Sequence, residues 1–397
     1  MKSVKNIDVA EKRVLIRGDF NVSLDQQGKV IDDFRIRATL PTLQYLIEQG
    51  AKIILLAHLG RPLQNQGGRS DITDLRERFS LRPIANRLVE LLQREIKLAP
   101  DCIGEGINEL AMRLEPGEIL MLENLRFHQG EEANDETFAR SLAEMGEIYV
   151  NDAFAVSHRA HASVEAITRF LPSFAGFLLS KEIDNLLRAR DNPGHPLTVI
   201  IGGAKMSTKI KLIQTFLNKA ENIILGGALA NTVLHAKGIA VGKSIIEESM
   251  APEINKLEIT DTKIHLPLDA LVCSSREDIS GCHPGPIGMT QQNESIFDIG
   301  FDSQKLFSRV INSSKMIVWN GPMGLFEVEA FAFGTKAIAE AIAGSAAYSI
   351  VGGGETVAYL EKIGLVDKFS FVSTGGGAML EFLAGEKLPG LTALENG

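Results

Sequence analysis

The sequence is poor in cysteine and has no excess of positive charge. Cys102, Cys273 and Cys282 are the only cysteines among 397 residues. Three scattered cysteines do not make a disulfide framework, so we expect free thiols in a reducing compartment. His283 stands beside Cys282, but a fourth ligand at suitable spacing for zinc is missing from this part of the sequence, so free thiols remain the prediction.

The sequence also has no long apolar run and no sign of export. The net charge of −9 argues against a nucleic-acid partner, which would call for a basic surface. Apolar runs such as IILLA, residues 53–57, are much shorter than a membrane span, and the polar N-terminal segment has no apolar signal core. We therefore expect a cytoplasmic protein with neither membrane nor nucleic acid as a partner.

Two common nucleotide-binding signatures are absent as well. The segment GIAVGKS is not a P-loop, because Gly238 and Gly242 stand one residue too close together. No G-x-G-x-x-G motif occurs, which weighs against a dinucleotide-dependent oxidoreductase. A Ser–His–Asp arrangement with local support is also lacking, so nothing favours covalent catalysis.

What the sequence does contain is an alternation of short apolar runs and longer segments with helical spacing. Since runs buried on both faces and separated by helices are typical of parallel sheets, we predict an α/β fold in each half. The chain is too long for one core, and residues 191–196 (DNPGHP) mark the expected break between two domains. The predicted strands are KRVLIRG, AKIILLA, GEILMLEN, GEIYVND, LTVIIGG, ENIILGG, KMIVWNG, AYSIVGG and SFVSTGG.

Glycine turns end most predicted strands of the second half. Such turns let the backbone approach a ligand closely, and the helix that follows presents its N–H groups to phosphate. One glycine turn is explained by geometry alone, but several in one half favour a nucleotide site. Lys205 and Lys209 follow the first turn, in a segment with helical character, and we expect them to contact phosphate. The turns are Gly202–Gly203, Gly226–Gly227, Gly352–Gly354 and Gly375–Gly377.

Arginine is concentrated in the first half, where residues 1–190 hold 18 of the 20 arginines. Arginine binds carboxylate and phosphate through a planar fork, and polar clusters directly follow several predicted strands, so we predict one shared basic pocket for a small polyanion. A structural ion pair is the alternative for any one of them. These clusters supply Asp19, Asn21, His58, Arg61, Arg126 and Arg159.

Two further pairs of basic residues are separated by short spacings. Arg35 and Arg37 stand two apart at the entry to a predicted helix, so they are not expected to face the same way. His158 and His161 stand three apart without a recognisable zinc pattern around them, so we expect capping or packing roles.

The motifs taken in order resemble the phosphoglycerate kinase family, from near residue 13 to near residue 391. The resemblance implies two Rossmann-like domains with parallel sheets flanked by helices, joined by a hinge with a deep cleft between them. It implies a reversible phosphoryl transfer from 1,3-bisphosphoglycerate to Mg-ADP, giving 3-phosphoglycerate and Mg-ATP, in a monomer. The motifs are RVLIRGDFNV, DDFRIRATLPT, AHLGRP, ENLRFHQGEE, NDAFAVSHRAHAS, IIGGAKMSTKI, VWNGPMGLFE, FGTKAIAEAIA and STGGGAMLEFLAGEKLPGL.

The resemblance also divides the chain. It implies a 3-phosphoglycerate domain at residues 1–175, a connecting helix and hinge at residues 176–195, and a nucleotide domain at residues 196–379. The tail, residues 380–397, would pack back on the first domain.

Site residues follow from the matching motifs. Those implied for 3-phosphoglycerate are Asp19, Phe20, Asn21, Arg35, His58, Leu59, Gly60, Arg61, Arg126 and Arg159. Those implied for ADP or ATP are Gly203, Ala204, Lys205, Lys209, Gly226, Gly227, Asn320, Pro322, Leu325, Glu327, Gly352, Gly353, Gly354, Glu355 and Thr356. The catalytic set would be Arg35, Lys209, Gly375, Gly376 and Gly377, and Glu355 would be the Mg²⁺ ligand.

Three departures from the family pattern stand out. Glu355 replaces the usual aspartate, GGALANTV replaces the usual glycine triplet and aromatic residue, and GDFNVS lacks the usual proline. Two other classes therefore stay open at this point: another small-molecule kinase or ligase, and a non-catalytic binding protein in which Glu355 has disabled the metal site.

Overall fold

The computed structural model describes residues 1–63, 72–257 and 262–396 of the chain. The chain forms two compact units, Met1–Asp184 together with Lys387–Gly397, and Asn185–Glu386. Helix α7 (Phe177–Asp191) carries the chain from the first unit into the second. Residues 380–386, which the sequence assigned to the tail, cluster with the second unit.

The first unit is built on a six-stranded parallel sheet with the order β3-β4-β2-β1-β5-β6. Its central strands are almost wholly buried, as their uninterrupted apolar sequences predict. The strands are β1 (Arg13–Arg17), β2 (Lys52–Leu56), β3 (Ile96–Leu98), β4 (Ile119–Met121), β5 (Ile148–Asn151) and β6 (Ser173–Ala175).

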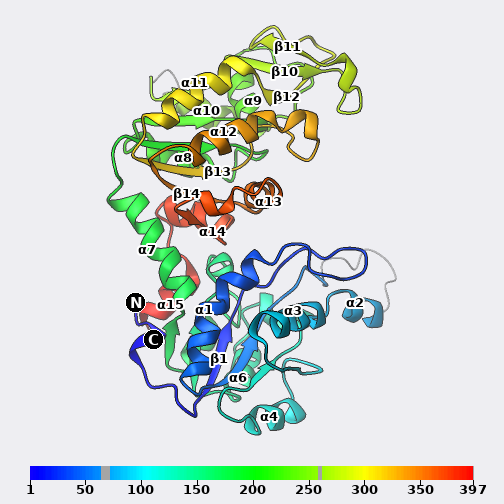
Figure 1. The fold of residues 1–397 in the computed structure, drawn as a ribbon, viewed down its shortest axis with the longest axis vertical. Coiled ribbons are helices and arrows are strands. Elements are labelled where there is room, and N and C mark those ends of the chain that lie inside the picture. Colours follow the sequence, from blue (N-terminus) through cyan, green and yellow to red (C-terminus); the bar gives the residue numbers. More distant parts are fainter. Residues whose placement is uncertain (64–71, 258–261, 397) are drawn as a thin grey trace. The chain divides into compact units, whose positions relative to one another are not determined.

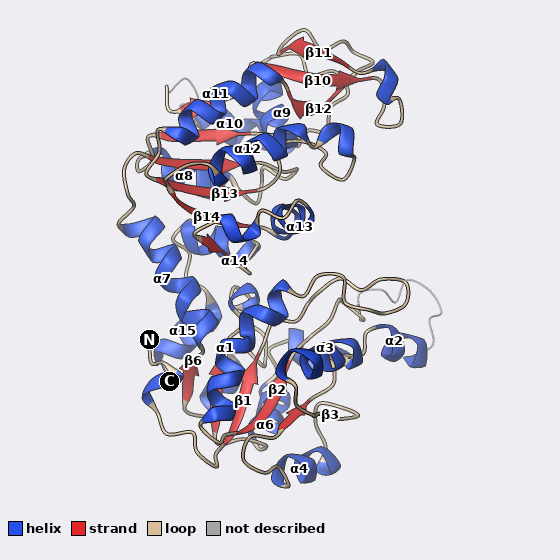
Figure 2. Cartoon of the chain, viewed as in Figure 1, coloured by secondary structure: helices blue, strands red, loops and turns tan. Residues whose placement is uncertain are grey.

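Helices flank this sheet (Figures 1 and 2). Helix α3 shows why they dock, because its apolar residues Ile84, Ala85 and Leu88 recur on one face and are buried there. The last helix, α15, lies against β6 near the N-terminus. The helices are α1 (Phe34–Glu48), α2 (Ile72–Arg78), α3 (Arg82–Leu92), α4 (Glu105–Met112), α5 (Gln129–Glu132), α6 (Glu136–Ala143) and α15 (Pro389–Asn396).

The second unit contains another six-stranded parallel sheet, with the order β15-β14-β13-β7-β8-β9. The prediction of an α/β fold with a parallel sheet in each half is thus confirmed. The strands are β7 (Leu197–Ile201), β8 (Asn222–Leu225), β9 (Ile264–His265), β13 (Met316–Asn320), β14 (Tyr348–Gly352) and β15 (Phe371–Val372). The helices are α8 (Ile210–Leu217), α9 (Gly227–Ala236), α10 (Ala251–Lys256), α11 (Phe301–Asn312), α12 (Phe333–Ala343), α13 (Gly354–Lys362) and α14 (Gly377–Leu383).

A small antiparallel sheet in the second unit was not predicted. Strand β10 (Asp269–Cys273) pairs with β11 (His283–Pro286) on one side and with β12 (Ser295–Ile299) on the other. The sequence HPGP of β11 carries two prolines and is largely exposed, so it gives no strand signal.

The prediction of free thiols is wrong for two of the three cysteines. Cys273 ends β10 and forms a disulfide with Cys282, which directly precedes β11. The pairing of these antiparallel strands brings the two residues together across the connecting loop. Cys102 is a free thiol, as predicted, and it is buried.

Each parallel sheet has one point at which its strand order reverses. In the first unit β2 lies on one side of β1 and β5 on the other; in the second, β8 and β13 lie on either side of β7. In open α/β sheets such points open a crevice at the carboxyl ends of the strands, where ligands bind. The ends of β1 and β5 and the ends of β7 and β13 are therefore the places to look for sites.

Candidate active site

Arg17 ends β1 at the reversal point of the first sheet, and its side chain is only 1% exposed. Its Nε donates to the Ser163 hydroxyl at 2.9 Å, and its Nη2 contacts His58 Nδ1 at 3.1 Å. A third nitrogen, Nη1, donates to the carbonyl of Gly18. All three guanidinium nitrogens are thus held, which fixes the group rigidly at the strand end.

Asp19 and Asn21 follow β1 and face the neighbouring loop. Asp19 accepts a hydrogen bond from Arg35 Nη1 at 2.8 Å, and the Asn21 side chain accepts one from the backbone of Gly60 at 2.8 Å. Gly60 has a φ of +61°, which favours glycine there. Arg37 pairs instead with Asp33 at 2.7 Å, so Arg35 and Arg37 do face different ways, as their spacing predicted.

Arg126 sits in a short 3-10 turn, Leu125–Phe127, just after β4. Its Nη1 donates to the carbonyl of Gly60 at 2.7 Å, and Glu132 approaches its Nε at 3.2 Å without hydrogen-bond geometry. Within the described residues, Nε and Nη2 are buried and have no hydrogen-bond partner. Burial lowers the pKa of Arg126 to about 10, so the guanidinium is still charged at neutral pH.

His158 and His161 lie in the loop after β5 and not on a helix. Burial, followed by nearby arginines, lowers the pKa of His158 to about 4 and that of His161 to about 3. Both rings are therefore neutral at pH 7. In the described part of the chain the Nδ1 atoms of both are buried without a hydrogen-bond partner, although His161 Nδ1 lies 3.8 Å from Glu131. Arg159 donates to His158 Nε2 at 3.2 Å.

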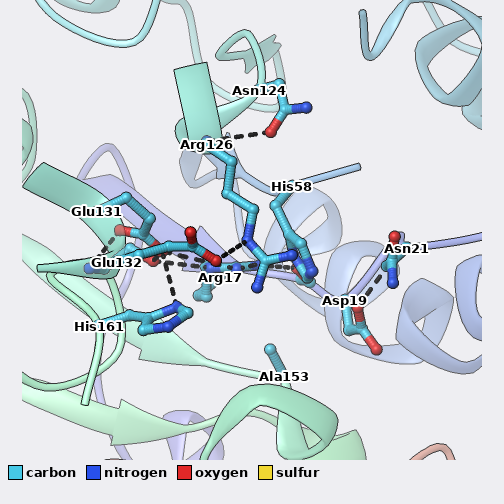
Figure 3. A network of polar contacts seen from close by, with 12 residues as sticks. Arg17, Asp19, Asn21, His58, Asn124, Arg126, Glu131, Glu132, Ala153 and His161 are labelled. Atoms are coloured by element: carbon cyan, nitrogen blue, oxygen red, sulfur yellow. Dashed lines mark hydrogen bonds and ion pairs between the residues drawn. The ribbon is translucent and has the colours of Figure 1, made fainter. Parts of the chain in front are cut away.

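These side chains, contributed by several strand ends, gather at one place, which Figure 3 shows from close by. Buried donors without partners are rare in folded proteins and call for an explanation. An anionic ligand would supply the missing acceptors for Arg126 and balance the charge of the arginines. Phe20 and Leu59 are buried in the core beneath this site and support it by packing, whereas Arg61 is exposed.

Sequence reasoning missed four residues of this network: Arg17, Glu131, Glu132 and Ser163. Arg17 did leave a signal, because a charged residue ends an otherwise apolar buried strand. Glu131 and Ser163 left no signal in the local sequence, because their contacts join segments that are far apart in the chain.

The glycine turns meet at the reversal point of the second sheet. Gly202 and Gly203 donate to the carbonyls of Asn320 at 2.9 Å and Pro322 at 2.8 Å, which ties the ends of β7 and β13 together. A Cβ atom on Gly202 would lie 2.1 Å from the carbonyl of Pro322. Glycine is required here because two strand ends approach each other this closely.

The two lysines of this turn do not lie on one helix, contrary to the prediction. Helix α8 begins at Ile210, after both of them. Lys205 is exposed, while Lys209 is 8% exposed and donates from Nζ to the carbonyl of Gly202. Burial lowers the pKa of Lys209 to about 8, and the charge of Glu355 opposes this shift.

A cavity opens beside these turns. Its lining is mostly apolar, with Phe297 and Ile296 supplied by β12 of the unpredicted antiparallel sheet. Burial raises the pKa of Asp298 in the same lining to about 7. Of the residues predicted for the nucleotide, the cavity is lined by Gly203, Ala204, Gly227, Pro322, Leu325, Glu327 and Glu355.

The last two glycine turns begin helices α13 and α14. Gly353 has a φ of +101°, and Glu355 is exposed in the first turn of α13. Asn320 and Thr356 are buried and tie strand ends together: Asn320 donates to the carbonyl of Gly352 at 3.1 Å, and Thr356 accepts from the amide of Gly321 at 3.0 Å.

One cluster in the described residues has the composition of a metal site, namely Asp101, Cys102 and His128. His128 already bonds Asp101 at 2.6 Å, and Arg76 bonds the other carboxylate oxygen at 3.1 Å. Burial raises the pKa of the Cys102 thiol well above its usual value, which disfavours the thiolate that a metal needs. Its contacts are those of a hydrogen-bonded network.

Among the helices that the structure describes, none is long and apolar enough to cross a membrane. One α/β unit thus carries a cluster of buried arginine and histidine side chains at its strand ends, and the other carries close-packed glycine turns beside an apolar cavity. Such a pairing fits the class of phosphotransferases, which move a phosphoryl group between a nucleotide and a small anionic substrate.

Comparison with known proteins identifies the family. Residues 4–386 match the sequence model of the family named phosphoglycerate kinase. The chain is 46% identical over 400 residues to phosphoglycerate kinase of Desulfosudis oleivorans, covering 100% of this chain and 99% of the relative. It is 44% identical over 398 residues to that of Thermomicrobium roseum, covering 99% of each.

Solved structures agree with this assignment. The structure of phosphoglycerate kinase from Coxiella burnetii matches with a TM-score of 0.83 at 40% identity, covering 99% of this chain and 98% of that one. The one from Pyrococcus horikoshii OT3 matches with a TM-score of 0.85 at 33% identity, covering 100% and 98%. The chain belongs to the phosphoglycerate kinase family, which confirms the resemblance found in its motifs.

Proposed function

We propose that this chain catalyses the reversible transfer of the acyl phosphate of 1,3-bisphosphoglycerate to ADP, giving 3-phosphoglycerate and ATP. One observation of the structure carries the proposal: Arg126 is buried near Arg17 and Arg159, and two of its guanidinium nitrogens make no hydrogen bond. A small ligand rich in phosphate and carboxylate oxygens satisfies such donors. Membership of the family along nearly the whole chain supports the same reaction.

The glycerate pocket is assigned to the first unit. Arg126 and Arg159 bind the anionic groups by charge, His58 binds as a neutral donor, and Asp19 and Asn21 bind the hydroxyl and hold Arg35 in place. The full proposed set is Asp19, Phe20, Asn21, Arg35, His58, Leu59, Gly60, Arg61, Arg126 and Arg159. Phe20 and Leu59 contribute by packing, since both are buried.

The nucleotide is assigned to the second unit. The apolar cavity takes the base, Glu327 accepts from the ribose hydroxyls, and the glycine turns bring backbone N–H groups to the phosphates. The full proposed set is Gly203, Ala204, Lys205, Lys209, Gly226, Gly227, Asn320, Pro322, Leu325, Glu327, Gly352, Gly353, Gly354, Glu355 and Thr356. Asn320 and Thr356 act by fixing the turns, because their side chains already bind backbone groups.

The donor set around Glu355 suits Mg²⁺. An exposed carboxylate in the first turn of α13 stands beside the glycine turns, and Mg²⁺ in kinases is commonly held by one or two carboxylates together with substrate phosphates. When bound, Mg²⁺ would neutralise charge on the nucleotide phosphates. The longer side chain of glutamate, compared with aspartate, is compatible with this role.

Positioning and charge stabilisation account for the transfer itself, because phosphoryl transfer needs little covalent chemistry from the protein. Arg35 and Lys209 stabilise the migrating phosphoryl group, and the backbone N–H groups of Gly375, Gly376 and Gly377 add to this. With a pKa of about 8, Lys209 is mostly protonated at neutral pH. Water must be excluded because an acyl phosphate hydrolyses readily, so the two bound ligands have to meet in a closed state.

The location of the protein, its oligomeric state, its hinge and the role of its tail are inferred as well. We infer a cytoplasmic monomer with a hinge between residues 176 and 195. The helix α15 in the tail would tie the chain end to the glycerate domain, which its grouping with the first unit supports.

The reaction is tested by coupling ATP formation from 1,3-bisphosphoglycerate and ADP to a colour-forming reaction, with and without Mg²⁺. We expect ATP formation that depends on Mg²⁺. Nucleotide binding without transfer would point to a non-catalytic binding protein. Phosphorylation of another acceptor, with no ATP formed from 1,3-bisphosphoglycerate, would point to a different kinase or ligase.

A further inference from the structure

Glu131 is a fully buried carboxylate that the proposed reaction does not use. It lies at 0% exposure in α5, next to Arg17 and His161 (Figure 3). Its two oxygens accept from the backbone amide of Ser163 at 3.0 Å and from the Ser163 hydroxyl at 2.7 Å. A buried carboxylate needs such donors, and they leave it with a defined orientation.

The direction of each hydrogen bond in this network follows from chemistry. A carboxylate only accepts, so the Ser163 hydroxyl donates to Glu131 and accepts from Arg17 Nε at 2.9 Å. Arginine only donates, so Arg17 Nη2 donates to His58 Nδ1 at 3.1 Å. The Nδ1 atom of His58 therefore carries a lone pair, and the ring proton lies on Nε2.

Three features hold Arg17 in this arrangement. The Glu131 carboxylate lies 3.9 Å from Nη2 and compensates the buried charge, the Ser163 hydroxyl fixes Nε, and the Gly18 carbonyl fixes Nη1. Ser163 is itself anchored, because its carbonyl accepts from the buried Tyr149 hydroxyl at 2.6 Å. Loss of Glu131 would leave the Arg17 charge uncompensated in the interior.

We propose that Glu131 is a positioning residue which, through Ser163 and Arg17, fixes His58 as the neutral Nε2–H tautomer, so that His58 offers a hydrogen-bond donor to the anionic substrate. The inference rests on the proposed function and names a further residue that serves the same site. An imidazolium would place an Nδ1–H against the Arg17 donor, and the other tautomer would do the same, so both are excluded by the contact. In Figure 3 the His58 ring lies beside the Arg126 guanidinium, within the proposed pocket.

The electrostatic surroundings of His58 agree with a neutral ring. Burial is the largest cause that lowers the pKa of His58 well below its usual value. Arg17 from β1, Arg126 from the turn after β4, and Arg159 and His161 from the loop after β5 lower it further. The ring thus binds an anion without adding charge to a pocket already crowded with arginines.

The tautomer is measured by long-range proton–nitrogen NMR on the full-length protein labelled with ¹⁵N-histidine, without ligands at neutral pH. A His58→Gln variant identifies the His58 signals. In the wild type we expect the His58 signals to show a proton on Nε2 alone. In Glu131→Gln we expect them to show a mixture of the two neutral tautomers. In the ATP-consuming direction we expect the KM for 3-phosphoglycerate to rise about tenfold in that variant, the size of one lost hydrogen bond to a charged group, while the KM for ATP stays within about twofold.

Variants of Ser163 give a second test of the inference, which remains available if the Glu131→Gln protein does not fold. Ser163→Ala should show the same mixed pattern and the same rise in KM, and Ser163→Thr, which keeps the hydroxyl, should restore both. Glu123→Gln is the matched control, because Glu123 is also a buried carboxylate that accepts from a serine hydroxyl at 2.8 Å and a backbone amide at 2.8 Å. It should lose stability without changing the His58 pattern.

A wild-type ring with its proton on Nδ1, or on both nitrogens, would overturn the inference. So would an unchanged pattern and KM in both Glu131→Gln and Ser163→Ala. The tautomer is read in the ligand-free protein, so this result stands whether or not the ATP-forming assay supports the proposed reaction.

Discussion

The two units hold their sites in opposite ways. In the first unit side chains make the site: arginines and histidines are buried at strand ends and held by a network that reaches Glu131 and Ser163. In the second unit the backbone makes much of the candidate site: close-packed glycines tie β7 to β13, and the buried Lys209 stands among them.

This difference is what the two proposed ligands would require of one parallel-sheet architecture. A small polyanion is recognised by charge, and buried charge has to be organised by further side chains that supply compensating groups. A nucleotide offers an apolar base and a chain of phosphates, which an apolar cavity and backbone N–H groups match without many charges. Substitutions should therefore affect the two units in distinct ways.

The largest effect is expected from Arg35→Ala. If Arg35 stabilises the migrating phosphoryl group, the variant should lower kcat by at least about a hundredfold, as loss of a transition-state charge contact does. Steady-state assay of ATP formation measures this. Arg37→Ala is the matched control, since Arg37 lies on the same helix and pairs with Asp33, and it should retain turnover. A variant at position 35 with near-normal turnover would reject the assigned role.

Lys209 should make stability depend on pH in a direction opposite to most lysines. Below pH 8 it is charged in both states, and burying that charge destabilises the fold. Between pH 8 and the ordinary value near 10.4, the unfolded state keeps a proton that the folded state releases, so the free energy of unfolding rises with pH. Urea unfolding at pH 7.5 and 9.5 should show a rise of about 2 kcal/mol in the wild type relative to Lys209→Met. Lys205→Met, at the exposed neighbour, should behave as the wild type; the same pH dependence in all three proteins would contradict the prediction.

Gly227→Ala should weaken ADP binding by the second unit and leave 3-phosphoglycerate binding by the first unit unchanged. A Cβ there would lie 2.8 Å from the Gly203 amide nitrogen, at a φ of +63°. Such strain should raise the Kd for ADP about tenfold by calorimetry, with the Kd for 3-phosphoglycerate unchanged. Gly238→Ala has a similar φ of +76° but no atom within 4 Å of the new Cβ, so it controls for backbone strain alone. Equal ADP binding by the two variants would show that the close approach at Gly227 is not needed.

The smallest effect is expected from Glu355→Asp. The shorter carboxylate restores the residue usual in the family, so the Mg²⁺ concentration needed for half-maximal ATP formation should fall a few-fold. Glu361→Asp, the same change later on α13, serves as the control. An identical Mg²⁺ dependence in wild type and Glu355→Asp would show that Glu355 is not a ligand.

Much of the fold was accessible from the sequence because local patterns encode it. Strands such as RVLIR and LTVII are short runs dominated by apolar residues, and each one lies in a buried parallel strand. The strands that were missed are β3, β6, β9, β10, β11 and β12. Some of them are short or exposed, since β9 has two residues and β11 is HPGP, but β10 and β12 have five residues each. Their positions depend on which neighbour they pair with, and a local window does not contain that information.

Only part of the candidate site could be predicted from the sequence. Arginines at strand ends pointed to a shared pocket, and the structure brings Arg17, Arg126 and Arg159 near both His58 and His161. The partners of these groups could not be predicted, because Ser163 lies 146 residues from Arg17. The disulfide between Cys273 and Cys282 was missed for a related reason, since the pairing of β10 with β11 brings the two residues together.

The sequence by itself determined the α/β class, the glycine turns and the family, because each depends on residue types at short fixed spacings. The tertiary structure decided which charges are buried, which hydrogen bonds orient His58, and where the apolar cavity opens. Those properties depend on contacts between segments far apart in the chain, and burial then changes the pKa values and the roles of the same side chains.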